Sequence, residues 1–139
     1  MQTVRDVMTT NVEACTTLDN VYEVASKMKE LNVGAIPIVE NGQVMGMITD
    51  RDLVIRGIAE RKPNSQKVTD VMSAHLVTVS PDMSVEEASQ LMAQHQVRRL
   101  PVVQNGQLVG IVALGDLATN KYSDQKAGAA LTEISEPLH

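Results

Sequence analysis

The sequence predicts an α+β protein made of two tandem copies of a β-α-β-β-α unit, and three observations support this prediction. Positions 4–53 align without a gap with positions 68–117, and sixteen of these fifty pairs are identical. An Asn-Gly pair stands between apolar runs in each copy, at 41–42 and 105–106, as is typical of a two-residue β-hairpin. A helical spacing of apolar residues precedes each hairpin. Because two copies are too few for a solenoid, we expect them to pack on each other about a pseudo-twofold axis.

The composition is that of a globular chain with an almost entirely aliphatic core. The 139 residues are 43% hydrophobic and 21% charged, with no Phe or Trp, two Tyr and eight Met. A net charge of −5 argues against binding to the phosphates of DNA or RNA. No apolar run approaches the ~20 residues that cross a bilayer, and we expect no secretory signal. With a lone cysteine, Cys15, we expect a cytoplasmic protein with neither nucleic acid nor membrane as partner.

Each copy is expected to open with a short strand followed by a helix. Residues 12–15 and 76–79 are β-prone runs. The helix starts carry the pattern of a capping box, at 20–23 (Asn to Glu) and at 84–87 (Ser to Glu). Apolar residues at helical spacing form one face of the first helix: Val21, Val24, Ala25, Met28 and Leu31.

A hairpin and a second helix complete each copy. Asn32 and Gln96 stand where a helix commonly ends in a left-handed residue. The hairpin strands are expected at residues 35–39, 43–48, 100–103 and 108–112. The closing helices are expected to begin near Asp50 and near Gly115.

These elements divide the chain into four segments. The first repeat is expected at residues 1–61 and the second at 68–120. Residues 62–67 are polar and rich in turn formers, which indicates a linker. The tail at 121–139 has little periodicity, and we expect it to be mobile or weakly helical.

The repeated residues resemble the CBS-domain pair, also called the Bateman module. The marks are an Asp-Val-Met at 6–8 and 70–72, a Pro-hydrophobic-Val before each Asn-Gly, and a closing Gly-hydrophobic-hydrophobic-Thr-x-x-Asp at 46–52. The resemblance covers about residues 1–120. It implies a non-catalytic regulatory module that binds an adenosine-containing ligand, such as AMP, ADP, ATP or S-adenosylmethionine, in clefts between the copies. It also implies a homodimer and an effector protein that the module regulates.

The resemblance assigns one better ligand site. Asp52 is expected to accept hydrogen bonds from the ribose hydroxyls, and the Thr49 hydroxyl to approach the phosphate. Arg98 and Arg99 are expected to reach the phosphate from the other copy, since a guanidinium binds phosphate oxygens bidentately. The residues expected to shape the adenine slot are Ile48 and Val97. From the residues alone, the Thr-x-x-Asp also fits a plain helix cap, and the arginines also fit solvated or acid-paired side chains.

A second site is expected to be weaker. It would use Asp116 with Val33, Gly34 and the Thr10 region. The second copy keeps the aspartate but has Ala113 in place of threonine. The site therefore lacks a hydroxyl, and we expect it to bind more weakly or to take a ligand with less phosphate.

No catalytic or metal-binding pattern accompanies these residues. His75, His95 and His139 lack the spacing of zinc ligands. We find no Ser-His-Asp set, P-loop or Gly-x-Gly-x-x-Gly, so we expect no enzyme, no metal and no required cofactor. Cys15 and the methionines that repeat at an offset of 64 residues are expected to pack in the core. Asp19 and Asp82 are expected to cap helices.

The alternative function for the whole chain is a ligand-free dimerisation scaffold.

Overall fold

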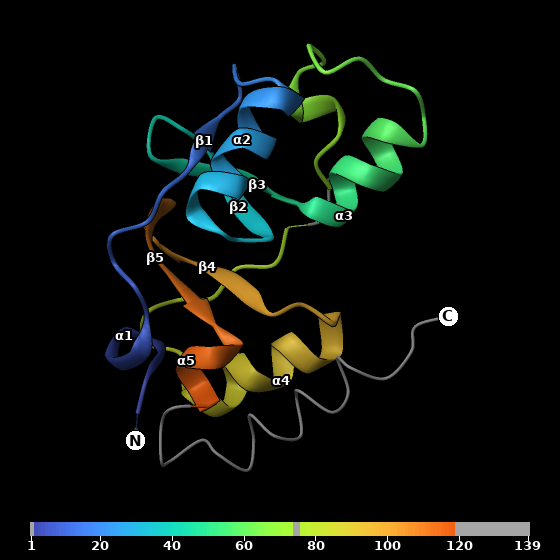
Figure 1. The fold of residues 1–139 in the computed structure, drawn as a ribbon. Helices are drawn as coiled ribbons and strands as arrows, with labels where there is room; N and C mark the ends of the chain where they lie inside the picture. Colours follow the sequence, from blue (N-terminus) through green and yellow to red (C-terminus); the bar gives the residue numbers. More distant parts are fainter. Residues whose placement is uncertain (1, 74–75, 119–139) are drawn as a thin grey trace. The chain divides into compact units, whose positions relative to one another are not determined.

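The computed structural model describes residues 2–73 and 76–118, which form two compact units (Figure 1). The first-copy unit is Glu13–Leu76. The second-copy unit combines the described residues of Met1–Val12 and Val77–His139. No helix among the described residues is both long enough and apolar enough to cross a bilayer. The expected tail at 121–139 lies outside the described residues.

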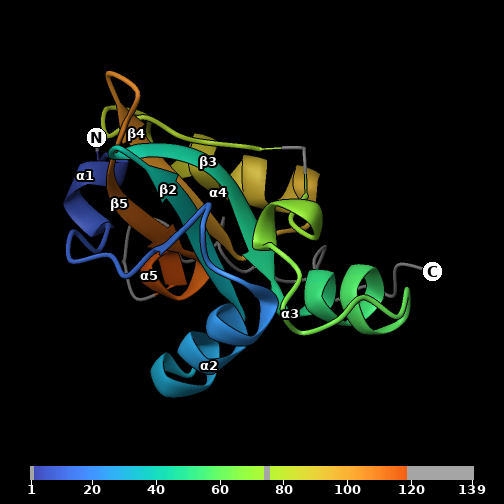
Figure 2. The same ribbon diagram turned by 90° about the horizontal axis from the view of Figure 1, so that it is seen from above.

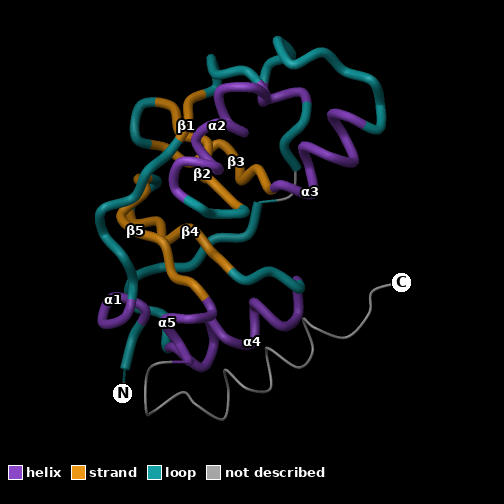
Figure 3. Tube along the Cα trace, in the orientation of Figure 1, coloured by secondary structure: helices purple, strands orange, loops and turns teal. Residues whose placement is uncertain are grey.

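The first-copy unit has a three-stranded sheet. Its elements are β1 (Cys15–Thr16), α2 (Val21–Leu31), β2 (Ala35–Glu40), β3 (Gln43–Thr49), α3 (Asp50–Asp52), the π-helical η1 (Leu53–Ile58) and the 3-10 helix η2 (Val68–Asp70). Strand β1 pairs with β2 in parallel, and β2 pairs with β3 antiparallel, with a bulge between Ile38 and Val39 (Figure 3). Strand β1 is shorter than the expected run at 12–15 and lies at its end, because only Cys15 and Thr16 find partners on β2.

The second-copy unit has the equivalent long helix, hairpin and closing helix, preceded by α1. Its elements are α1 (Val4–Val7), α4 (Val85–His95), β4 (Arg99–Gln104), β5 (Gln107–Ala113) and α5 (Leu114–Ala118). Strands β4 and β5 pair antiparallel, with a bulge between Val102 and Val103. The expected strand at 76–79 is reduced to one parallel bridge between Val79 and Val102. The predicted α+β fold class and element order are thus confirmed.

Local capping interactions start the long helices. Asn20 Oδ1 accepts a hydrogen bond from the Glu23 N–H at 2.8 Å, and Glu23 Oε1 accepts one from the Asn20 N–H at 3.3 Å. This is the predicted capping box. The prediction of a second box is wrong in one half. Ser84 Oγ accepts from the Glu87 N–H at 3.1 Å, but the described contacts include no bond from the Ser84 N–H to the Glu87 carboxylate.

Left-handed residues end the helices and turn the hairpins, as predicted. Asn32 and Gln96 have φ of 56° and 55°. The Asn-Gly turns have φ of 52° and 80° at 41–42, and of 54° and 80° at 105–106. Positive φ at both central residues is the requirement of the tight turn that matches strand twist, so this pair sets the hairpin register in each copy.

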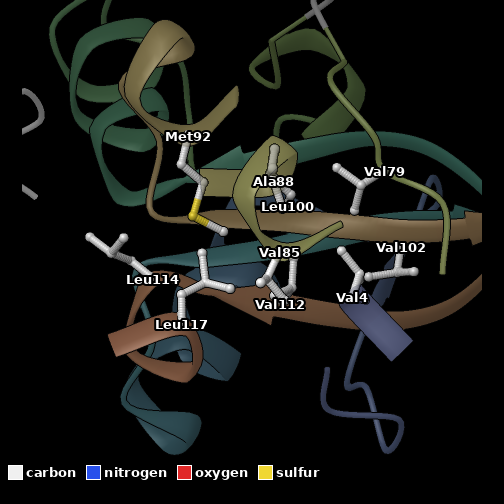
Figure 4. Packing of buried hydrophobic residues seen from close by; sticks show 10 residues of the cluster. All are labelled: Val4, Val79, Val85, Ala88, Met92, Leu100, Val102, Val112, Leu114 and Leu117. Atoms are coloured by element: carbon white, nitrogen blue, oxygen red, sulfur yellow. The ribbon is translucent and has the colours of Figure 1, made fainter. Parts of the chain in front are cut away.

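Each unit has its own apolar core. In the first-copy unit, α2 buries Val21, Val24 and Met28, while Ala25 is exposed and Leu31 half-buried. The prediction that Ala25 belongs to the buried face of this helix is therefore wrong. In the second-copy unit, α4 and α5 cover the β4–β5 hairpin (Figure 4). Its buried residues are Val4, Val79, Val85, Ala88, Met92, Leu100, Val102, Val112, Leu114 and Leu117.

The leading segment of each copy packs in the unit of the other copy. Val4 is fully buried in the second-copy unit, where its N–H donates to the Met83 carbonyl at 2.8 Å. Val68 is fully buried in the first-copy unit, where its N–H donates to the Asp19 carbonyl at 3.0 Å. Donors and acceptors in these two bonds are equivalent in the repeat. The segment at 62–67 lies within the first-copy unit, where the Gln66 carbonyl accepts from the Val21 N–H at 2.9 Å.

A methionine of each leading segment lies against a glycine of a hairpin. A Cβ placed on Gly46 would lie 2.9 Å from Met72 Sδ. A Cβ placed on Gly110 would lie 2.9 Å from both Met8 Sδ and the Thr9 carbonyl oxygen. Both distances are shorter than real Cβ contacts allow, so a side chain at Gly46 would displace Met72, and one at Gly110 would also meet a backbone oxygen.

Two aspartates differ from their predicted role as helix caps. Asp19 Oδ2 accepts from the Thr16 N–H at 2.8 Å, which closes a turn ahead of the cap residue of α2. Asp82 forms an exposed ion pair with Arg5 at 3.2 Å. In both cases the carboxylate bonds to a donor other than the N–H groups at the start of the long helix.

Candidate functional site

The turn from β3 into α3 holds the predicted Thr-x-x-Asp (Figure 2). Thr49 Oγ1 accepts a hydrogen bond from the Asp52 N–H at 3.0 Å, and Asp52 Oδ2 accepts one from the Thr49 N–H at 2.9 Å. The pair therefore forms a complete capping box with aspartate at its third position. Both residues are half-buried, so the box is fixed but still reachable from solvent. The alternative interpretation as a cap is confirmed.

The box leaves hydrogen-bonding capacity unused. Asp52 Oδ1 takes no hydrogen bond from the part of the chain that the structure describes. A carboxylate has about four lone-pair positions, and the box occupies one of them. The Thr49 hydroxyl serves as acceptor, so its own hydrogen is available for donation. The capping role and a ligand role are compatible, since they use different lone pairs and hydrogens.

The equivalent turn of the second copy keeps only the aspartate. Asp116 Oδ2 accepts from the Ala113 N–H at 2.9 Å, the same bond that Asp52 makes. Ala113 has no hydroxyl to return the bond. The aspartate is therefore held in the same position by half of a box.

A strand-start corner adjoins each of these turns. In the first copy the Asp50 N–H donates to the Gly34 carbonyl at 2.9 Å. In the second copy the Leu114 N–H donates to the Arg98 carbonyl at 2.8 Å. The backbone bond is the same, so Gly34 and Arg98 are equivalent in structure as well as in sequence.

The two arginines are not neutralised by acids of the described chain. Arg98 is exposed and Arg99 is half-buried at the start of β4. None of the ion pairs shown within residues 2–73 and 76–118 includes either guanidinium. The alternative in which they are paired with Asp or Glu is therefore not seen there. Unpaired guanidinium groups are suited to binding an anion.

Part of the predicted site belongs to the first-copy unit. Ile48 is buried at the end of β3, directly before Thr49, while Val33 is half-buried and Gly34 exposed before β2. These lie in the first-copy unit with Asp52.

The remaining predicted residues belong to the second-copy unit. These are Thr10, Val97, Arg98, Arg99 and Asp116. Thr10 is exposed and follows Thr9, which pairs with Ile111 through two backbone hydrogen bonds of 2.8 and 2.9 Å. The association of Asp52 with the arginines stays a prediction.

Asp50 is a residue that sequence reasoning missed. Its Oδ2 would lie 3.0 Å from a Cβ placed on Gly34. The signal was present in the repeat, because the equivalent of Asp50 is Leu114 and the equivalent of Gly34 is Arg98. Comparing the copies by charge rather than by identity would have found it.

Metal-binding and nucleophilic groups do not gather among the described residues. No group of three or more His, Cys, Asp or Glu side chains is placed there to hold a metal ion. His75 and His139 lie outside the described residues, and His95 is half-buried on α4. Cys15 is buried, and this burial, together with the nearby Asp19 carboxylate, raises the pKa of its thiol to about 11. A thiol with this pKa stays protonated at neutral pH, which is unsuited to nucleophilic work.

Comparison with known proteins agrees with the repeat. The family model for the CBS domain matches residues 4–57 and again 68–121. Uncharacterized protein YlbB of Bacillus subtilis is 55% identical over 138 residues, which cover 98% of this chain and 93% of that protein. A crystal structure of Hypoxic Response Protein I with two coordinated zinc ions matches with a TM-score of 0.79 and 36% sequence identity. The match covers 98% of that chain and 86% of this one.

A third similar protein carries ligands. The CBS domain pair of protein MJ0100, in complex with 5′-methylthioadenosine and S-adenosyl-L-methionine, has a TM-score of 0.75. The two sequences are 23% identical, and the alignment covers 86% of this chain and 94% of the MJ0100 chain. This likeness concerns the fold alone. Two matches to one family model, at the two copies of the repeat, together cover well over half of the chain. The chain belongs to the CBS-domain family, as a tandem pair of CBS domains.

Proposed function

We propose that this CBS pair is a regulatory module that senses an adenosine-containing nucleotide and has no catalytic activity of its own. The observation that carries the proposal is Asp52. Its carboxylate is positioned by one hydrogen bond of a capping box and keeps Oδ1 for a ligand. Two adjacent hydroxyls of a ribose are suitable donors to such a group, because an ionised carboxylate only accepts hydrogen bonds.

The better site combines groups from both copies. Asp52 binds the ribose hydroxyls, and the Thr49 hydroxyl donates to the phosphate. Arg98 and Arg99 neutralise the phosphate, which agrees with the absence of a described acid paired with them. The residues that flank the adenine are Ile48 and Val97.

The weaker site uses the same scheme with fewer donors. Asp116 binds the ribose, next to Val33, Gly34 and the Thr10 region. Ala113 supplies no hydroxyl, and Gly34 supplies no positive charge where the other site has Arg98. We therefore expect unequal occupancy when a nucleoside phosphate is titrated.

The test is a thermal-shift and calorimetric screen with AMP, ADP, ATP, S-adenosylmethionine and NADH. The diagnostic variant is Asp52→Asn, because its amide oxygen still accepts from the Thr49 N–H. It removes the negative charge and one acceptor, and we expect affinity to fall roughly 10- to 100-fold, since hydrogen bonds to a charged group contribute roughly 1.5–3 kcal/mol.

A matched control separates ligand binding from capping. Asp6 is also the third residue of a Thr capping box, and its Oδ2 accepts from the Thr3 N–H at 3.0 Å. Asp6→Asn makes the same chemical change outside the proposed site and should leave the affinity unchanged. Absence of binding to the whole panel, or equal losses in both variants, would contradict the proposal.

A ligand-free dimerisation scaffold is the second candidate, and an exposed apolar face favours it. Val54, Ile55 and Ile58 of η1 are 50%, 48% and 70% exposed. Together with the resemblance to CBS pairs, this supports a homodimer in either case. Sedimentation of the unliganded chain tests it: an Ile58→Glu variant should dissociate a dimer that uses this face.

We further propose a cytoplasmic location and an effector protein that binds the module according to whether its ligand is present.

A further inference from the structure

The two copies differ in charge at one equivalent corner. The corner of the first copy consists of Gly34 and Asp50, joined by a backbone hydrogen bond of 2.9 Å. The corner of the second copy consists of Arg98 and Leu114, joined by the same bond at 2.8 Å. One corner thus carries a carboxylate beside a bare backbone, and the other carries a guanidinium beside an apolar side chain.

The Asp50 carboxylate occupies the space next to Gly34. The three nearest heavy atoms to a Cβ placed on Gly34 are all from this carboxyl group, at 3.0, 3.4 and 3.6 Å. Asp50 is exposed, and no ion pair within the described residues neutralises it. Its negative charge therefore acts on whatever approaches Gly34.

We propose that Asp50 determines ligand specificity: it makes the site of Asp116 select an adenosine compound without phosphate, with an uncharged or cationic 5′ group. The inference rests on the proposed function, in which the nucleoside held by Asp116 lies against Gly34 and the one held by Asp52 lies against Arg98. A phosphate near Gly34 meets a like charge at close range, whereas a sulfonium or ammonium group meets an opposite charge. The module therefore has one site for a nucleoside phosphate and one for a phosphate-free nucleoside.

The experiment measures affinities of the full chain for adenosine, AMP and S-adenosylmethionine by titration calorimetry. The Asp52→Asn variant is the background, because it weakens the other site. In this background we expect adenosine and S-adenosylmethionine to bind more tightly than AMP. Adding Asp50→Leu, the residue of the second copy, should raise the AMP affinity relative to adenosine about tenfold and lower that of S-adenosylmethionine.

A control and a transplant sharpen the test. Glu30→Gln removes one negative charge from an exposed position of α2 and should leave the ratio of AMP to adenosine affinity unchanged. Gly34→Arg combined with Asp50→Leu recreates the corner of the second copy and should give a chain with two AMP sites. The Asp50 change makes room for the new side chain, because only Asp50 atoms are among the three nearest neighbours of that Cβ.

The outcomes separate this inference from the proposed function. If the unsubstituted chain binds neither adenosine, AMP nor S-adenosylmethionine, the proposed function fails and the inference fails with it. If the chain binds them but Asp50→Leu leaves the ratio of AMP to adenosine affinity unchanged, only the inference is overturned. Thermal unfolding of each variant verifies that it is folded.

Discussion

The first-copy and second-copy units share one framework but differ in the details around it. Both have the same hairpin with a bulge at an equivalent position, the same left-handed helix ends and the same Met–Gly contact. They differ at the closing turn, where one capping box is complete and the other is half formed. They differ also in the charge of the corner at Gly34 and Arg98. The comparison teaches that the repeat preserves the packing and backbone geometry, while the residues that would meet a ligand have diverged.

The largest expected difference concerns the two hairpin glycines. A Cβ at Gly110 would lie 2.9 Å from a backbone oxygen, which cannot move freely, whereas at Gly46 the near atom belongs to the flexible Met72 side chain. We expect Gly110→Ala to lower the free energy of unfolding by about 2–3 kcal/mol and Gly46→Ala by about 1 kcal/mol. Urea unfolding of both variants measures the difference, and equal losses would show that the two contacts are equivalent.

The next effect is an alkaline instability of the first-copy unit alone. Burial, with help from the Asp19 carboxylate, raises the pKa of the Cys15 thiol from 9.0 to about 11. Since the unfolded chain loses this proton first, stability falls as the pH rises from about 9 to about 11, by on the order of 2 kcal/mol.

The second copy supplies the control for this effect. The residue equivalent to Cys15 is Val79, which is 2% exposed. Cys15→Val should remove this part of the pH dependence with little change in stability at neutral pH. Parallel pH profiles of denaturant unfolding for the two proteins would contradict the prediction.

The capping turns should respond in opposite directions. Thr49→Ala removes the hydroxyl that accepts the Asp52 N–H, and we expect a loss of about 1 kcal/mol. Ala113→Thr offers the missing hydroxyl to Asp116 and should add up to about 1 kcal/mol. The melting temperatures of the two variants should therefore move apart, and a fall in both would contradict the view that Asp116 keeps half a box.

The smallest effect is expected at the exposed ion pair of Arg5 and Asp82. The equivalent positions of the first-copy unit are Thr69 and Leu18, and these described residues form no ion pair. Both side chains are at least half exposed, so solvent screens the attraction. Asp82→Asn should change the free energy of unfolding by less than about 0.5 kcal/mol. A larger change in denaturant unfolding would mean that Asp82 does more than pair with Arg5.

Local chemistry explains which parts of the fold could be predicted. The Asn-Gly turns, the cap at Asn20 and the left-handed residue Asn32 depend on neighbours within a few positions, so the sequence alone indicates them. The exchange of leading segments depends on contacts such as that of Val4 with Met83. These join residues far apart in the chain, and no short pattern encodes them.

The candidate site shows the same division. The Thr-x-x-Asp turn was predicted because its hydrogen bonds span three residues. The position of the Asp50 carboxylate was missed because it lies beside Gly34, sixteen positions away in the sequence, through the pairing of β2 with β3. Strand register, rather than any pattern of residue types, brings that carboxylate to the corner.

A crystal structure of the chain grown with AMP is the most direct test of the central claim. The account predicts the ribose hydroxyls within hydrogen-bonding distance of the Asp52 carboxylate and the phosphate against Arg98 or Arg99. AMP bound elsewhere, or crystals at saturating AMP with no nucleotide beside Asp52, would contradict it.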